Sequence, residues 1–143
     1  MATGLQSRCI DEAIKYALEE KRFGIPVCEH QAIQMLLADM AINNELSRML
    51  TYRSAWELMT GVSHGYYSTL AKCFAGDAAN KAANSAVQIL GANGYNREYG
   101  VEKLLRDAKI FQIYDSTNET QRNIIAKNLL DRIQQIGSIS LIA

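Results

Sequence analysis

Residues 88–115, "QILGANGYNREYGVEKLLRDAKIFQIYD", link two helical patterns through one glycine-rich loop. Glycine and asparagine recur in residues 91–100, and both residue types interrupt helices. Residues 101–114 follow as a predicted helix with apolar side chains at helical spacing: Leu104, Leu105, Ala108 and Phe111. Residues 66–90 precede the loop as another predicted helix, and one ridge of it carries small side chains: Ala71, Ala75, Ala79, Ala82, Ala83 and Ala86. Small side chains allow helices to approach closely, so this ridge predicts that other helices pack closely against residues 66–90.

Helical periodicity extends over the rest of the chain, whose abundant Ala, Leu, Ile, Lys, Glu and Gln favour helix. Residues 4–21 predict a first helix with one apolar face: Leu5, Cys9, Ala13 and Tyr16 or Ala17. Residues 22–27 form a break that contains Gly24 and the only proline, Pro26.

Two further helices complete the pattern. Residues 29–60 predict a long helix that ends near Gly61 and the cap-like Ser63. Its apolar stripe has spacings of three and four: Ile33, Leu36, Leu37, Met40, Leu46, Met49, Leu50 and Trp56. Residues 117–136 predict a last helix with its own stripe: Ile125, Leu129, Ile133 and Ile136. No segment shows the alternation that predicts a strand.

These elements predict an all-α fold: an antiparallel four-helix bundle with a short additional helix, in a single domain over residues 1–143. The helix over residues 29–60 would be roughly 45 Å long. A bundle of this size needs less length, so part of that helix is expected to meet another subunit or domain.

Composition excludes several classes of function. Lys plus Arg and Asp plus Glu each total 15, and no basic block points to nucleic acid. No apolar run reaches the roughly 18 residues of a membrane helix, and the N-terminus lacks signal-peptide order, so membrane insertion is not predicted. The cysteines, Cys9, Cys28 and Cys73, are interpreted as free thiols. No metal site is predicted, because neither their spacing nor His30 and His64 match a metal motif.

The most specific signal lies within residues 88–115. The segment resembles the C-terminal signature of the acyl-CoA dehydrogenases, which is Gln, two residues, Gly-Gly-x-Gly, and then acidic, basic and acidic residues. The matching positions are Gln88, Gly91, Ala92, Asn93, Gly94, Glu98, Lys103 and Asp107, and only Ala92 departs from the pattern. "RCIDEAIKYALEEKRFG", "EHQAIQMLLADMA" and "RDAKIFQIYDSTNETQRNIIAK" resemble further motifs of the family in the same order. Medium-chain members are the most similar.

The resemblance implies the helical C-terminal domain of an FAD-dependent enzyme that dehydrogenates fatty acyl-CoA at the α,β bond. It also implies an N-terminal helical domain and a middle β domain, which would lie upstream and are not in this sequence. Family members are commonly dimers or tetramers through this domain, so a homo-oligomer or association with full-length members is expected. The family points to the mitochondrial matrix, whereas a chain complete without a presequence points to the cytoplasm.

By the same resemblance, Tyr114-Asp115-Ser116-Thr117 stands where medium-chain members have Tyr-Glu-Gly-Thr. Asp115 occupies the position of the catalytic base, Tyr114 and Asp115 are the predicted substrate-binding residues, and Thr117 matches a flavin contact. Asp is one methylene shorter than Glu, and Ser116 replaces a glycine. The residues alone favour a second interpretation, in which Ser116 or Thr117 caps the next helix.

The predicted FAD contacts come from several segments: Arg22, Phe23, Gln31, Gln88, Gly91, Gly94 and Thr117. The family arginine that contacts the pyrophosphate is Glu20 here, a charge reversal, and Arg22 is its possible substitute. From the residues alone, Phe23 is equally a core aromatic, Gln31 a solvated polar residue, and the glycines a plain turn between helices.

Two functions remain open. In the first, the chain is part of a dehydrogenase but has little or no activity alone, because two domains are missing and the base and pyrophosphate positions have changed. Glu119 and Lys127 change two further family positions, from Gln and Arg. In the second, the chain is a catalytically dead interaction or oligomerisation module. The sequence can also be a fragment of a longer protein.

Overall fold

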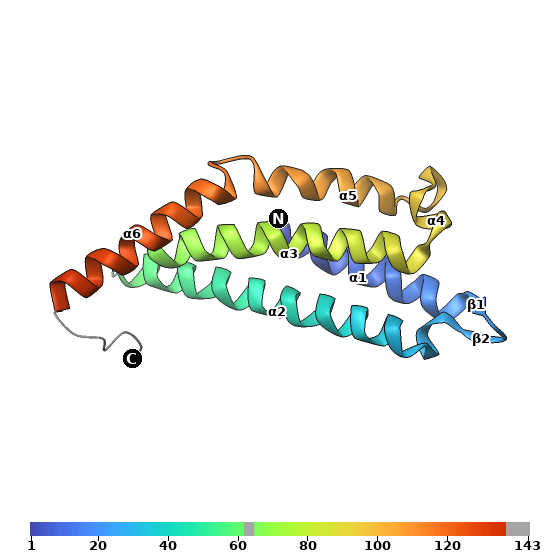
Figure 1. Cartoon of the computed structure of the whole chain (residues 1–143). Coiled ribbons are helices and arrows are strands. Elements are labelled where there is room, and N and C mark those ends of the chain that lie inside the picture. Colours follow the sequence, from blue (N-terminus) through green and yellow to red (C-terminus); the bar gives the residue numbers. More distant parts are fainter. Residues whose placement is uncertain (62–64, 137–143) are drawn as a thin grey trace.

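The computed structural model describes residues 1–61 and 65–136 (Figure 1). Ser63, His64 and the apolar stretch after residue 136 lie outside the described residues, as does the side chain of Ile136. No helix within these ranges is both long and apolar enough to cross a membrane.

The fold is a bundle of long helices: α1 (Ala2–Glu19), α2 (Gln31–Thr60), α3 (Tyr66–Leu90), α5 (Val101–Lys109) and α6 (Asn118–Ile136). In Figure 1, α1, α2 and α3 run side by side, α5 lies along α3, and α6 extends past the other end of α3. A sixth, four-residue helix, α4 (Ala92–Tyr95), was not predicted. The predicted all-α bundle is therefore confirmed.

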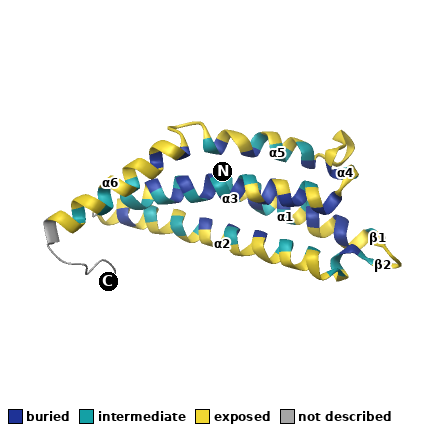
Figure 2. Cartoon of the chain, viewed as in Figure 1, coloured by how far each residue is buried: buried dark blue, intermediate teal, exposed yellow. Residues whose placement is uncertain are grey.

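The centre of the core is α3, because its small side chains let α1, α2, α5 and α6 pack against it. The predicted alanine ridge is buried along its length (Figure 2). The predicted apolar face of α1 is buried against it through four residues: Cys9, Ala13, Tyr16 and Ala17.

The first break in the helical pattern is a β-hairpin. Strand β1 (Lys21–Arg22) pairs antiparallel with β2 (Ile25–Pro26). Phe23 (φ 54°) and Gly24 (φ 86°) form its two-residue turn, in which both residues need a positive φ. The 3₁₀ turn η1 (Val27–Glu29) then leads into α2. The expectation of no strand is wrong here, because two-residue strands are too short to show alternation.

Two predicted boundaries also differ. The loop expected over residues 91–100 contains α4 and the 3₁₀ turn η2 (Arg97–Tyr99). The helix expected over residues 101–114 ends at Lys109 and tightens into the 3₁₀ turn η3 (Ile110–Gln112). The backbone of η3 rests directly on α3, because a Cβ at Gly76 would lie 2.6 Å from the carbonyl oxygen of Phe111.

The apolar stripe predicted for α2 is only partly in the core. Met40 is buried, but three members of the stripe are about half exposed: Leu46, Met49 and Trp56. Polar residues take the inward positions of this half of α2. The side-chain amide of Gln6 donates to Ser47 Oγ at 3.1 Å, and both residues are fully buried. The second half of α2 therefore meets α1 through hydrogen bonds and turns an apolar face outward.

Candidate functional site

The structure separates the predicted site residues into two groups. Tyr114, Asp115 and Thr117 lie at the corner between η3 and α6. The others lie around the β-hairpin and the adjoining ends of α2, α3 and α4: Arg22, Phe23, Gln31, Gln88, Gly91 and Gly94. Figure 1 shows the hairpin at the end of the bundle where α1 leads into α2, whereas the corner lies where α5 leads toward α6.

The corner has a strained backbone. Asp115 (φ 51°) and Ser116 (φ 77°) are consecutive residues in the left-handed region, where a non-glycine residue costs roughly 1–2 kcal/mol. Thr117 Oγ1 accepts a hydrogen bond from the backbone N–H of Thr120 at 3.3 Å, so Thr117 is the residue that caps α6. Asp115 is exposed. Capping therefore does not use the Asp115 carboxylate.

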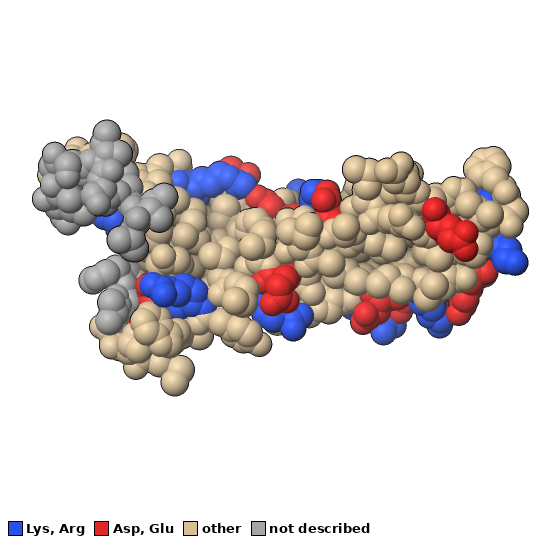
Figure 3. Space-filling model, turned by 90° about the horizontal axis from the view of Figure 1, so that it is seen from below, with Lys and Arg blue, Asp and Glu red and all other residues tan. Residues whose placement is uncertain are grey.

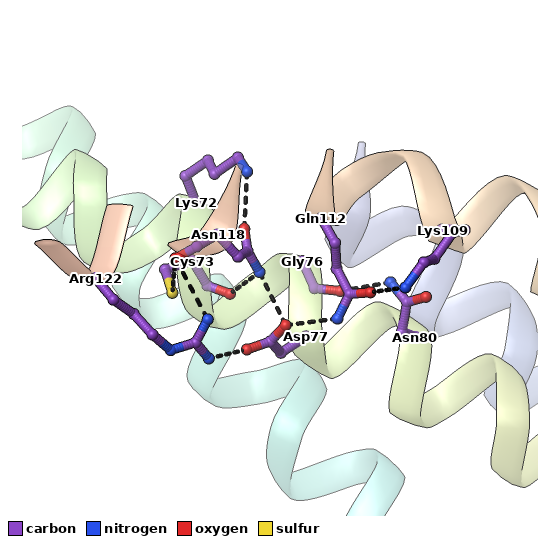
Figure 4. A network of polar contacts seen from close by, with 9 residues as sticks. All are labelled: Lys72, Cys73, Gly76, Asp77, Asn80, Lys109, Gln112, Asn118 and Arg122. Atoms are coloured by element: carbon purple, nitrogen blue, oxygen red, sulfur yellow. Dashed lines mark hydrogen bonds and ion pairs between the residues drawn. The ribbon is translucent and has the colours of Figure 1, made fainter. Parts of the chain in front are cut away.

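The carboxylate of Asp77 on α3 anchors both sides of the corner (Figure 4). It accepts hydrogen bonds from Gln112 Nε2 on η3 at 2.7 Å and from Asn118 Nδ2 on α6 at 2.9 Å, and it pairs with Arg122. Partial burial alone would raise the pKa of Asp77, but these three donors outweigh burial and hold that pKa below its ordinary value. One ionised side chain thus ties η3 and α6 to α3.

Lys72 contacts the corner itself. Its Nζ donates to the backbone oxygen of Ser116 at 2.6 Å. It also donates to Asn118 Oδ1 at 2.7 Å (Figure 4). Asn118 is almost fully buried and also donates to the backbone oxygen of Cys73 at 3.0 Å. The corner is therefore fixed to α3 through the ammonium group of Lys72 as well as through Asp77.

Sequence reasoning missed this network, because α3 was interpreted only as a ridge of small side chains. The available signal was a pair of polar residues that lie between these alanines in the sequence, Asp77 and Asn80. Asn80 Nδ2 donates to the backbone oxygen of Ala108 at 2.7 Å, so it fastens the end of α5 to α3. Polar residues inside an otherwise small and apolar helix face indicate partners on the facing segment.

A cavity of about 520 Å³ opens beside the hairpin, and its lining includes Arg22, Phe23 and Gly91 together with His30 and Ile33. Phe23 is 98% exposed, and its ring meets His30 edge-on with 6.1 Å between ring centroids. The interpretation of Phe23 as a core aromatic is therefore wrong. Aromatic and aliphatic walls of this kind suit a flat aromatic group.

The charge beside this cavity is mixed. Arg22 Nη1 pairs with Glu20 Oε1 at 2.9 Å, and both side chains are partly exposed. A surface pair of this kind contributes at most about 1 kcal/mol. Arg22 can therefore turn toward an anionic group at small cost, while Glu20 keeps a negative charge next to that group.

Glycine suits positions 91 and 94 for different structural reasons. Gly91 ends α3 with φ 61°, and no atom lies within 4 Å of a Cβ placed there, so a ligand can approach its backbone. A Cβ at Gly94 would lie 2.6 Å from the backbone oxygen of Val87, so packing against α3 alone requires glycine there. Gln31 and Gln88 are exposed and are not part of the cavity wall.

The fold and the sequence both match one known family. The model of the acyl-CoA dehydrogenase C-terminal domain matches residues 1–130. The chain therefore belongs to the acyl-CoA dehydrogenase family and corresponds to the C-terminal domain of its members.

Individual relatives agree with this assignment. The chain is 43% identical to a probable medium-chain specific acyl-CoA dehydrogenase, described as mitochondrial, of Caenorhabditis briggsae, over 96% of this chain and 33% of the relative. It is 47% identical to an acyl-CoA dehydrogenase of Bacillus subtilis, over 90% of this chain and 34% of that protein. Among solved structures, butyryl-CoA dehydrogenase from Megasphaera elsdenii superposes with a TM-score of 0.87 and 38% identity, over 90% of this chain and 34% of the other. The chain thus spans about a third of the length of these relatives.

Proposed function

We propose that this chain is the C-terminal domain of an FAD-dependent dehydrogenase that acts on fatty acyl-CoA in β-oxidation, with little or no turnover by itself. The observation that carries the proposal is the corner at Asp115. An exposed carboxylate stands there on a backbone that is anchored to α3 on both sides. That carboxylate occupies the position of the family's base.

The chemistry that Asp115 can perform is proton transfer. A general base must be ionised, partly desolvated and within hydrogen-bond reach of the proton that it takes. The corner supplies an exposed carboxylate on an anchored backbone, and a surface that covers Tyr114 and Asp115 would supply the desolvation. Because Asp is shorter than Glu, its carboxylate lies roughly 1 Å further back, a displacement that costs about a hundredfold in rate.

The hairpin end fits part of an FAD molecule. Phe23 and Ile33 offer aromatic and aliphatic walls, Gly91 leaves room for a close approach, and Arg22 is the cation that would meet a phosphate. Glu20 opposes that contact through its own charge. When bound, FAD would accept the β-hydrogen as hydride. The residues of this chain would hold the cofactor at one end and take the α-proton at the other.

A chimera tests the proposal. In it, this chain replaces the C-terminal third of the Bacillus subtilis acyl-CoA dehydrogenase, to which it is 47% identical. We expect the chimera to bind FAD and to reduce a dye with octanoyl-CoA about a hundredfold more slowly than its parent. The chain alone should show no turnover. Asp115→Asn should abolish turnover, whereas Asp131→Asn, an exposed carboxylate on α6, should leave it unchanged. Full turnover by Asp115→Asn would refute the proposed base.

A second function, self-association, is favoured by the outward face of α2. Figure 3 views the molecule from the α2 side, where the surface is mostly uncharged between scattered charges of both signs. Exposed apolar side chains recur there every seven residues: Met35, Ile42, Met49 and Trp56. Such a spacing keeps one seam of a helix facing a partner helix, and the same seam on a second copy is complementary to it. We propose a second copy of the chain as the partner of this face.

A further inference from the structure

Two consecutive left-handed residues need an external constraint. Asp115 and Ser116 both carry side chains, so their φ values of 51° and 77° are unfavourable in an isolated peptide. Strained backbone of this kind persists only where surrounding contacts determine it. The described contacts around the corner lead back to one helix, α3.

Lys72 makes the contact nearest to the strain. Its Nζ donates to the backbone oxygen of Ser116 at 2.6 Å, directly at the second left-handed residue. Asp77 acts further out, because it binds Gln112 before the corner and Asn118 after it. None of these contacts uses the Asp115 carboxylate. The network therefore fixes the backbone of Asp115 and leaves its side chain available.

We propose that Lys72 and Asp77 are positioning residues, which hold the Asp115–Ser116 backbone in its left-handed conformation and so set the direction of the Asp115 carboxylate. The importance of that direction for catalysis rests on the proposed function. The conformational effect itself is a property of this chain alone.

A general stabilising role makes a different prediction. If Lys72 only helped α6 to dock, its loss would weaken the fold without changing the strain at Ser116. If Lys72 holds the strained corner, its loss lets the corner relax, and the benefit of placing glycine at position 116 disappears. A double-mutant cycle separates the two cases, because it measures the coupling between the two residues.

The cycle uses the 143-residue chain with Ser116→Gly, Lys72→Met and the double variant. Ser116→Gly should raise the Tm of the wild-type chain by roughly 3–5 °C, because glycine relieves the left-handed strain. In the Lys72→Met background the rise should fall below half of that value. Lys81→Met is the matched control, since Lys81 lies on the same helix but pairs with Asp39. In that background the full rise should remain.

A spectroscopic measurement locates the effect. The backbone ¹⁵N and ¹³Cα chemical shifts of Asp115 and Ser116 should move in Lys72→Met and in Asp77→Asn, while those of α1 stay in place. Lys72→Arg, which keeps a cationic donor, should return them toward the wild-type values. An equal Tm rise in every background, or unmoved shifts at both residues, would overturn the proposal. Neither measurement requires flavin or acyl-CoA. If the chimera is inactive but Lys72 and Ser116 are still coupled, the result counts against Asp115 as the base and not against Lys72 and Asp77 as positioning residues.

Discussion

Under the proposed function, two single-residue differences, one methylene group and one charge, limit the chemistry of this chain. Asp115 is shorter than the glutamate whose position it occupies, and Ser116 adds a side chain where the backbone is left-handed. At the end of α1, Glu20 places a negative charge beside Arg22, which lines the cavity. Each of these differences lies in one side chain, so a single substitution can restore the family residue.

Asp115→Glu should increase the activity of the chimera. The longer side chain moves the carboxylate forward by about 1 Å, so kcat with octanoyl-CoA should rise by roughly ten- to a hundredfold. Steady-state dye reduction measures the change. Asp131→Glu adds the same methylene on α6 and should have no effect. A decrease on Asp115→Glu would show that the corner is fitted to the shorter side chain.

Glu20→Arg should strengthen FAD binding to the chimera. The replacement removes a repulsive charge and frees Arg22 from its ion pair, a gain of about 1 kcal/mol or roughly fivefold in Kd. Quenching of flavin fluorescence gives the Kd. Glu19→Arg makes the same charge change one residue earlier, whereas the ion pair with Arg22 is made by Glu20, so it should change the Kd less. Equal changes in Kd for the two replacements would mean that the net charge of this region, rather than the ion pair of Glu20 with Arg22, affects FAD binding.

At the scale of secondary-structure elements, η3 and α6 depend on one ionised side chain of α3. The pKa of Asp77 is lower in the folded chain than its ordinary value of 3.8, because Gln112, Arg122 and Asn118 outweigh burial. A lowered folded pKa stabilises the fold at pH values above the ordinary one. This contribution is lost as the pH falls through the folded value.

Asp77→Asn should therefore lower the Tm more at pH 7 than at pH 3. Thermal unfolding of the wild type and the variant across this range should give two curves that converge below a pH of about 4. The Tm of Asp131→Asn should follow the Tm of the wild type across the whole pH range. A constant gap between wild type and Asp77→Asn would mean that the ionised carboxylate does not contribute through this network.

The helices could be predicted from the sequence, whereas their connections and contacts could not. Periodicity locates α3 and its buried alanines, because side chains three and four apart share a face. It cannot show that Asp115 and Ser116 are left-handed, since that conformation is imposed by Lys72 and Asp77, some 40 residues earlier in the chain. It also cannot distinguish a core stripe from an exposed one, so Leu46, Met49 and Trp56 were assigned to the same face as Met40.

At the scale of the whole molecule, the outward face of α2 carries exposed apolar side chains at a spacing of seven residues. Ile42→Glu should shift the chain from dimer toward monomer, because a charge in the middle of an apolar seam is costly to bury. Size-exclusion chromatography with light scattering measures the mass. Ile14→Glu is the matched control on α1, where the side chain is 40% exposed. A wild-type chain that is strictly monomeric at high concentration would exclude self-association.

In the proposed function, the carboxylate of Asp115 takes the α-proton of an acyl-CoA thioester. The most direct measurement is the exchange of α-hydrogens of octanoyl-CoA with D₂O on the chimera without an electron acceptor, followed by mass spectrometry. We predict that the chimera catalyses deuterium incorporation and that Asp115→Asn eliminates it, while Asp131→Asn does not. Incorporation at the same rate in Asp115→Asn would contradict the claim.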